Sequence, residues 1–298
     1  MIRRPPRSTL DRSSAASDVY KRQELKGVDV SSIDEREFET VNKALVDFGV
    51  IYFREQSLTP SQQLQFASRW SEPHLHPYLS GLPDHPEIIE IIKEPDDPNN
   101  FGDHWHTDQI FTPAPAVATM LYAKEVPEIG GDTLFACMEH AYDALSDGMK
   151  TVVRQLFTFN QYDKQLPRSG KMSAKIPSVD KPTTPAIHPL VRRHPETGRP
   201  SLYLTDMETT LHFDNMTPEE SRPLIKYLLR HATRPEFTCR LEWQIGTLGI
   251  WDNRKILHMP LNDYPGKRRV MHRITTVSYT HLRAHETVLD LVCRLLLE

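Results

Sequence analysis

The sequence has 298 residues, and 36 Lys and Arg residues against 40 Asp and Glu residues give a formal net charge of −4. No stretch approaches the roughly 18 consecutive apolar residues that a membrane-spanning helix needs, and the slightly acidic balance argues against a general nucleic-acid binder. The 3 cysteines have no metal-like spacing, which argues against a zinc ribbon or a disulfide scaffold.

Both ends of the sequence read as foreign tails. Residues 1–23 are basic and rich in Ser but lack the apolar stretch of a signal peptide. They resemble the in-frame translation of a sequencing-adapter oligonucleotide, and residues 278–298 resemble the companion adapter. The alternative is a genuine basic tail and a genuine terminal helix. We expect two artefactual tails and, between them, one domain over residues 24–277.

The first half of this domain is expected to contain two helices and four strands. Apolar residues at helical spacing predict a helix over residues 34–48, capped by Ser31 or Ser32. A second helix over residues 61–70 follows Pro60. Apolar runs predict strands over residues 49–53, 87–92, 115–123 and 133–136.

The second half is expected to be richer in strands. Helical spacing recurs over residues 140–157, and Thr217 caps a predicted helix over residues 218–231. Residues 160–200 are rich in Pro, Lys, Ser and Thr, which indicates a long irregular insertion. Strands are predicted over residues 201–204, 237–243, 247–251 and 269–277. The fold class is therefore mainly β with flanking helices, a β-sandwich or jelly roll.

One segment has the composition of a metal site. His104, His106 and Asp108 are two residues apart in turn, so on an extended backbone their side chains share a face. This spacing does not choose between the two histidines. Such a triplet also occurs by chance, so the rest of the sequence has to supply further ligands.

Two later segments supply them. A lone His258 follows the turn formed by residues 251–254, and the basic cluster 268–273 places Arg269 and Arg273 on one face of a strand. The 11 residues from His258 to Arg269 predict a strand–turn–strand return. Two imidazoles and one carboxylate leave open positions on a metal, as in non-heme Fe(II) oxygenases. A nearby Arg suits the bidentate capture of a carboxylate.

Taken together, these motifs resemble the TauD/TfdA family of Fe(II)- and 2-oxoglutarate-dependent dioxygenases over residues 28–276. The motifs are WHTD at 105–108, GGDTLFA at 130–136, WDNR at 251–254, RRVMHR at 268–273 and, more weakly, FREQSLTPSQQ at 53–63, HLHP at 74–77 and HPLVR at 188–192. The resemblance implies a double-stranded β-helix, a cupin-like jelly roll with iron between its two sheets.

The resemblance also implies roles for particular residues. His106, Asp108 and His258 match the Fe(II) ligands, which makes them the catalytic centre. Thr133 and Arg269 match the residues that bind the distal carboxylate of 2-oxoglutarate.

Arg273 and His76 match residues that contact the primary substrate. For Arg273 the alternative is to brace the co-substrate from the other side. For His76 the alternative is a hydrogen-bonded loop residue.

Three positions depart from the taurine-specific members of the family. Leu79 and Glu208 stand where those members have aromatic residues, and Gly102 stands where they have Asn. These departures argue against taurine itself as the substrate. Glu208 would favour a polar or cationic group on the substrate if it faced the pocket, and otherwise it is a solvated loop residue.

The expected activity is hydroxylation of a small, anionic organic substrate with O2 and 2-oxoglutarate, releasing succinate and CO2. We expect a cytoplasmic enzyme whose partner is this small molecule, with no nucleic acid and no membrane, and we leave open whether it forms a homo-oligomer. The alternative is a non-catalytic relative that binds metal and 2-oxoglutarate without turnover.

Overall fold

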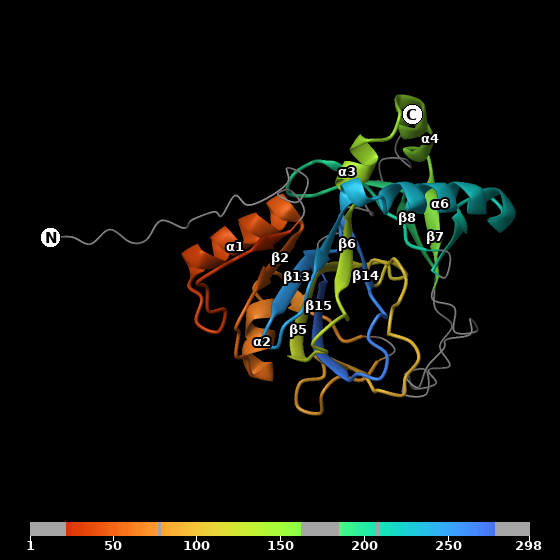
Figure 1. Cartoon of the computed structure of the whole chain (residues 1–298). Helices are drawn as coiled ribbons and strands as arrows, with labels where there is room; N and C mark the ends of the chain where they lie inside the picture. Colours follow the sequence, from red (N-terminus) through yellow and green to blue (C-terminus); the bar gives the residue numbers. More distant parts are fainter. Residues whose placement is uncertain (1–21, 77–78, 162–184, 207–208, 278–298) are drawn as a thin grey trace.

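The computed structural model describes residues 22–76, 79–161, 185–206 and 209–277, whose main feature is two β-sheets packed against each other (Figure 1). Apart from Arg22 and Gln23, the two expected tails lie outside these residues, so their assignment stays a prediction. Gln23, the last residue of the first expected tail, pairs with Ile51. Within the described part of the chain, none of the helices has the length and apolar character that crossing a membrane requires.

The major sheet has seven strands and is antiparallel except for its first pair. In spatial order its strands are β1 (Gln23–Glu24), β2 (Val50–Phe53), β13 (Leu248–Asp252), β5 (Ala116–Glu125), β15 (Arg269–Val277) and β3 (Glu72–Pro73), with β4 (Ile89–Lys93) also paired with β15.

The minor sheet has three antiparallel strands, in the order β12 (Thr238–Leu241), β6 (Thr133–Cys137) and β14 (Ile256–Pro260). Two small antiparallel sheets accompany it. They are formed by β10 (Pro200–Leu202) with β9 (Val191–Arg193), and by β11 (Thr210–Phe213), β7 (Phe157–Asn160) and β8 (Ala186–Pro189).

Side chains between the two large sheets form one apolar core. Leu121 and Met271 of the major sheet and Phe135 and Leu241 of the minor sheet belong to the same buried cluster. Because strand side chains alternate, Arg269, Met271 and Arg273 of β15 share the inner face, whereas Ile274 packs on the other side of the sheet. The predicted common face of the two arginines is therefore confirmed.

Helices cover the outer faces of both sheets (Figure 1). The helices are α1 (Glu35–Phe48), α2 (Pro60–Ala67), α3 (Met138–Asp143), α4 (Asp147–Val153), α6 (Pro218–Ala232) and the 3-10 helix η1 (Pro235–Phe237). α1 and α2 bury their apolar faces, including Leu45 and Phe66, against the major sheet. α3 and α6 pack outside the minor sheet around Leu228 and Leu257.

Several expected boundaries are correct and others are wrong. α6 begins after the predicted cap Thr217, and α2 begins at Pro60, one residue before the expected start. α1 is capped by Asp34 instead of Ser31 or Ser32. Asp34 prevails because Glu37 completes a reciprocal capping box with it. The helical pattern over 140–157 is broken into α3 and α4, since Ser146 caps a new helix.

The region around residue 190 also differs from the expectation, and the segment containing His258 matches it in part. Residues 160–200 include β8 and β9 as well as the residues 162–184, which lie outside the described part. His258 lies within β14, so the segment from His258 to Arg269 has the expected order of strand, turn and strand. The two strands do not pair with each other, because β14 belongs to the minor sheet and β15 to the major sheet. The chain between them crosses from one sheet to the other.

Candidate metal centre

Two histidines far apart in the sequence are joined by an isolated antiparallel bridge. The His106 amide donates to the His258 carbonyl at 3.0 Å, and the His258 amide donates to the His106 carbonyl at 2.8 Å. Directly opposed residues in such a pair carry their side chains on the same face. The ring centroids are accordingly only 4.1 Å apart.

Asp108 completes a group of three metal-ligating side chains. One of its oxygens lies 3.9 Å from His106 Nε2 and the other 3.8 Å from His258 Nε2. One ligand atom from each of the three residues lies within 4.8 Å of the other two. The structure thus brings together all three residues assigned as metal ligands.

The choice between His104 and His106 comes from the main chain. The His104 carbonyl lies 2.8 Å from His106 Nδ1, so Nδ1 carries the proton and Nε2 keeps its lone pair for a metal. The His104 ring lies outside the three-residue group, with its Nε2 3.8 Å from the Asp206 carboxylate. His104 therefore orients His106 through its backbone.

The electrostatics of the three groups suit a divalent cation. Burial lowers the pKa of His258 to about 4 and, together with the nearby His258, holds the pKa of His106 well below its usual value. Burial alone would raise the pKa of Asp108, but the charge of Arg273, the two histidines and the Thr119 hydrogen bond together outweigh it and keep that pKa low. Neutral imidazoles beside a carboxylate are the donor set that Fe(II) takes in non-heme oxygenases.

Arg269 and Thr133 are placed together by a tryptophan. The Trp243 indole nitrogen donates to the Thr133 hydroxyl at 2.9 Å, and the Arg269 guanidinium carbon lies 5.9 Å from the centre of the Trp243 ring. Arg269 is only 6% exposed, yet its Nε and Nη2 atoms have no hydrogen-bond partner among the described residues. A buried cation with unsatisfied donors is costly unless an anion binds to it.

Gly131 makes room for this arginine. Its φ of +74° is in the left-handed region, and a Cβ atom there would lie 3.4 Å from Arg269 Cδ and 3.3 Å from the Tyr264 ring. The positive φ is the reason that glycine is favoured at this position.

Arg273 contacts the metal group directly. Its Nη2 donates to Asp108 Oδ1 at 2.7 Å, while its Nε is buried without a partner in the described part of the structure. This contact distinguishes Arg273 from Arg269, which lies four residues earlier on β15. A free donor beside the metal group is compatible with an anion from a substrate or co-substrate.

His76 is less closely tied to this group. It is half-buried after β3, and its Nδ1 accepts from the Leu79 amide at 3.2 Å. It does not belong to the three-residue group. Its proposed contact with substrate stays a prediction, and Glu208 lies outside the described residues.

Gly102 lies against one of the ligands. A Cβ atom at this position would come within 2.9 Å of His106 Cε1, and the backbone φ is +71°. The Gly102 backbone therefore packs directly against the His106 ring, and any side chain at this position would clash with the ring.

Two residues around Asp108 were not predicted to contact it. The Thr119 hydroxyl donates to Asp108 Oδ2 at 2.6 Å, and the Asn253 amide nitrogen donates to Thr119 at 2.8 Å. Asn253 lies in the turn before His258, and its side chain contacts the carboxylate side of the site. Thr119 had no signal in the sequence beyond its place in a predicted strand.

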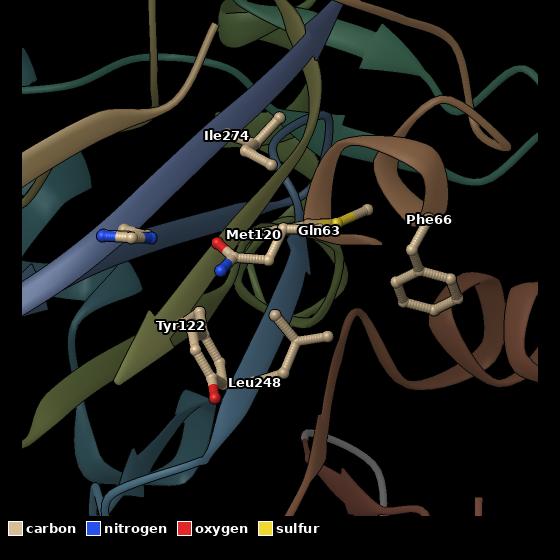
Figure 2. Close-up of a pocket in the computed structure, with 7 residues that line it drawn as sticks. Gln63, Phe66, Met120, Tyr122, Leu248 and Ile274 are labelled. Carbon is tan, nitrogen blue, oxygen red and sulfur yellow. The ribbon is translucent and has the colours of Figure 1, made fainter. Parts of the chain in front are cut away.

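The crevice in Figure 2 lies on the opposite face of the major sheet. Its lining residues are Gln63, Phe66, Met120, Tyr122, Leu248, His272 and Ile274. His272 thus points away from the two arginines. The chemistry is on the inner face of β15, and this crevice belongs to the packing under α2.

Comparison with known proteins identifies what the chain is similar to. The family described as "Taurine catabolism dioxygenase TauD, TfdA family" matches residues 12–275. The match starts inside the first expected tail, at residues that the structure does not describe.

Two curated relatives act on sulfur compounds, according to their names. An alkylsulfatase of Acinetobacter baylyi is 32% identical over 270 residues, covering 88% of this chain and 84% of the relative. An alpha-ketoglutarate-dependent sulfate ester dioxygenase of Pseudomonas putida is 30% identical over 260 residues, covering 85% of each.

A solved structure supports the same fold. A taurine dioxygenase from Burkholderia xenovorans superposes with a TM-score of 0.73 at 32% identity, covering 87% of this chain and 86% of that one. The expected jelly roll of two facing sheets is thereby confirmed.

Proposed function

The chain belongs to the TauD, TfdA family and is a 2-oxoglutarate-dependent dioxygenase, and we propose that His106, Asp108 and His258 hold Fe(II) as its metal. The observation that supports this most directly is the buried donor set of two neutral imidazoles and one carboxylate. Three protein ligands leave positions open for a co-substrate and for O2.

The second element of the proposal is the co-substrate site. Arg269 is a buried guanidinium with two nitrogens that have no partner among the described residues, and Thr133 contacts the same tryptophan, Trp243. These groups suit the distal carboxylate of 2-oxoglutarate, whose other end would reach the metal. In this arrangement Arg269 supplies the charge and Thr133 the hydroxyl that fix the orientation of the co-substrate.

Each protein group has a defined task in the reaction. When bound, the metal and 2-oxoglutarate supply the oxidative chemistry that converts O2 and 2-oxoglutarate into succinate, CO2 and a hydroxylated substrate. His106 and His258 remain neutral and keep their lone pairs on the metal side. Arg273 helps to keep Asp108 ionised through its hydrogen bond.

The primary substrate is proposed to be a small organic anion. Relatives named for alkyl sulfates and sulfate esters, and a structural neighbour named for taurine, all act on compounds with a sulfur oxyanion. Beside the metal group, the buried Nε of Arg273 has no partner within the described ranges, and it is a donor for such an anion.

The reaction class is tested by measuring succinate. The purified protein is supplied with Fe(II), 2-oxoglutarate and O2, and succinate is measured with each member of a panel of sulfate esters, sulfonates, aryloxy acids and betaines. We expect succinate formation that depends on Fe(II) and is stimulated by an anionic member of the panel. A protein that binds metal and 2-oxoglutarate but forms no succinate with any substrate would instead be the non-catalytic relative.

A pair of neighbouring variants tests the ligand assignment. His106→Ala should abolish metal binding and succinate formation. His104→Ala is the matched control, because it removes an imidazole 5.1 Å away but keeps the main-chain carbonyl that orients His106. Unchanged metal content in His106→Ala, with loss in His104→Ala, would transfer the ligand role to His104.

A further inference from the structure

A directed chain of hydrogen bonds ends on the metal-binding carboxylate. The Asn253 amide nitrogen donates to Thr119 Oγ1 at 2.8 Å, and Thr119 Oγ1 lies 2.6 Å from Asp108 Oδ2. An amide nitrogen can only donate and an ionised carboxylate can only accept. The Thr119 hydroxyl must therefore donate its single proton to Asp108, while its oxygen accepts a hydrogen bond from Asn253.

The Asn253 side chain is itself held in one orientation. Its Oδ1 accepts from the Trp251 indole at 3.1 Å and from the Asp108 backbone amide at 3.3 Å. Because two donors face this atom of the amide group, it must be the oxygen, and the amide nitrogen therefore faces Thr119. Asn253 is 1% exposed and Thr119 is fully buried, which leaves no water to replace these bonds.

The backbone of Asn253 joins the same segments. Its carbonyl accepts from the Thr107 hydroxyl at 2.9 Å, and its amide donates to the Val117 carbonyl at 2.9 Å. Asn253 also lies in the turn that connects β13 of the major sheet to β14 of the minor sheet, where His258 is located. One residue thus links the carboxylate ligand, the strand β5 and the turn that leads to the second histidine.

Both oxygens of Asp108 are occupied by directed donors. Thr119 binds Oδ2, and Arg273 binds Oδ1 from the neighbouring strand β15. A carboxylate held at both oxygens cannot rotate about its Cβ–Cγ bond without breaking a short, charge-assisted hydrogen bond. Its remaining lone pairs are therefore aimed in fixed directions before any metal binds.

We propose that Thr119 and Asn253 are positioning residues that preorganise Asp108 for the metal. This inference rests on the metal site described under the proposed function, and it assigns a new task to two residues that do not themselves touch a metal. Groups that orient metal ligands from behind typically change metal affinity by about 10–100-fold when they are removed.

Thr119→Val is the main test, because it removes the hydroxyl and keeps the shape. The full chain, freed of metal, is titrated with Co(II), and the visible absorption of the bound ion is recorded. We expect the dissociation constant to rise by about tenfold or more, with an altered spectrum. Thr119→Ser, which restores the hydroxyl, should bring both the affinity and the spectrum back towards the original values.

Thr276→Val is the matched control for the loss of a buried hydroxyl. Thr276 is also fully buried, and its hydroxyl donates at 3.4 Å to the Ala118 carbonyl, away from Asp108. It should leave Co(II) affinity within about twofold of the original, because it removes no bond to a metal-ligand side chain. Equal losses in the Thr119 and Thr276 variants would show a general packing effect and would overturn the proposal.

Asn253→Asp provides an independent second variant. It replaces the donor to Thr119 by an acceptor of the same shape, so Thr119 must share its proton between two carboxylates. We expect weaker Co(II) binding here as well, and this result decides the matter if Thr119→Val does not fold.

The outcomes separate this proposal from the proposed function. If the unmodified protein binds no Co(II), the metal assignment itself fails. If it binds Co(II) and both Thr119→Val and Asn253→Asp bind it equally well with an unchanged spectrum, only the positioning role is refuted.

Discussion

Replacing Arg269 by Leu tests the co-substrate site with two opposite effects. In the structure Arg269 is buried, and its Nε and Nη2 have no partner within the described residues. Burial accordingly lowers the pKa of its guanidinium. The side chain should therefore be unfavourable for the empty protein and favourable only when a carboxylate binds.

The magnitudes follow from the loss of one buried charge pair. A charge-assisted pair in a site from which water is excluded contributes on the order of 2–5 kcal/mol. At about 1.4 kcal/mol per decade, Arg269→Leu should weaken 2-oxoglutarate binding by roughly 30-fold to several thousand-fold. The free energy of unfolding of the empty protein should be unchanged or higher, since an unpaired buried charge is replaced by an apolar group.

Calorimetric titration measures the first effect. 2-Oxoglutarate is added to the Mn(II)-loaded protein, in which no turnover consumes it, and urea unfolding of the metal-free protein measures the second effect. Arg268→Leu is the matched control at the next residue. Arg268 is partly exposed and pairs with Glu94 and Glu125, so it should change 2-oxoglutarate affinity by less than about twofold.

Either of two results would refute this reasoning. If Arg269→Leu bound 2-oxoglutarate as tightly as the original protein, the co-substrate would be held elsewhere. If the free energy of unfolding of Arg269→Leu fell by as much as its free energy of 2-oxoglutarate binding, Arg269 would be a structural residue. This result would contradict the lack of partners for its nitrogens among the described residues.

Three other predictions address the substrate, the pH and the first tail. At saturating metal, Arg273→Leu should still form succinate slowly in the absence of a primary substrate, but an anionic substrate should no longer stimulate this reaction. If an anionic substrate stimulated the variant and the original protein equally, Arg273 would have no role in substrate binding. Because burial lowers the pKa of His258 from about 6.5 to about 4, the unfolded chain binds a proton between these values that the folded chain does not. Acid therefore favours unfolding. Urea titrations of the metal-free protein should show that the free energy of unfolding falls between pH 6.5 and pH 4, with His258 contributing up to about 1.4 kcal/mol per pH unit. The slope should be shallower in His258→Gln. Deleting residues 1–21 should leave the melting temperature and activity unchanged; a drop of several degrees would show that this segment belongs to the fold.

The sequence by itself was sufficient to predict the longer helices and the strand β15. α6 is predicted within one residue of its end, because its cap at Thr217, its first-turn Pro and its apolar spacing all act locally. The alternation along β15 likewise predicts that Arg269 and Arg273 share a face, since strand geometry alone requires it. The motifs around His106 and His258 were sufficient to indicate the family.

Contacts between distant segments were decided only by the tertiary structure. His104 and His106 are equivalent in spacing, and the choice is made by the backbone bridge from His106 to His258, 152 residues further along the chain. That bridge depends on β14, a short strand whose pairing with β6 has no local signal. Its position is set by the packing of one sheet on the other.

The surroundings of Asp108 follow the same rule. Thr119 is an ordinary residue of a strand and Asn253 an ordinary residue of a turn, 134 positions apart, until the fold places them in one hydrogen-bonded chain. Local sequence specifies backbone conformation and the alternation of faces, because these depend on neighbours within a few residues. Which buried donor meets which carboxylate depends on how the two sheets pack together, and this is a property of the whole chain.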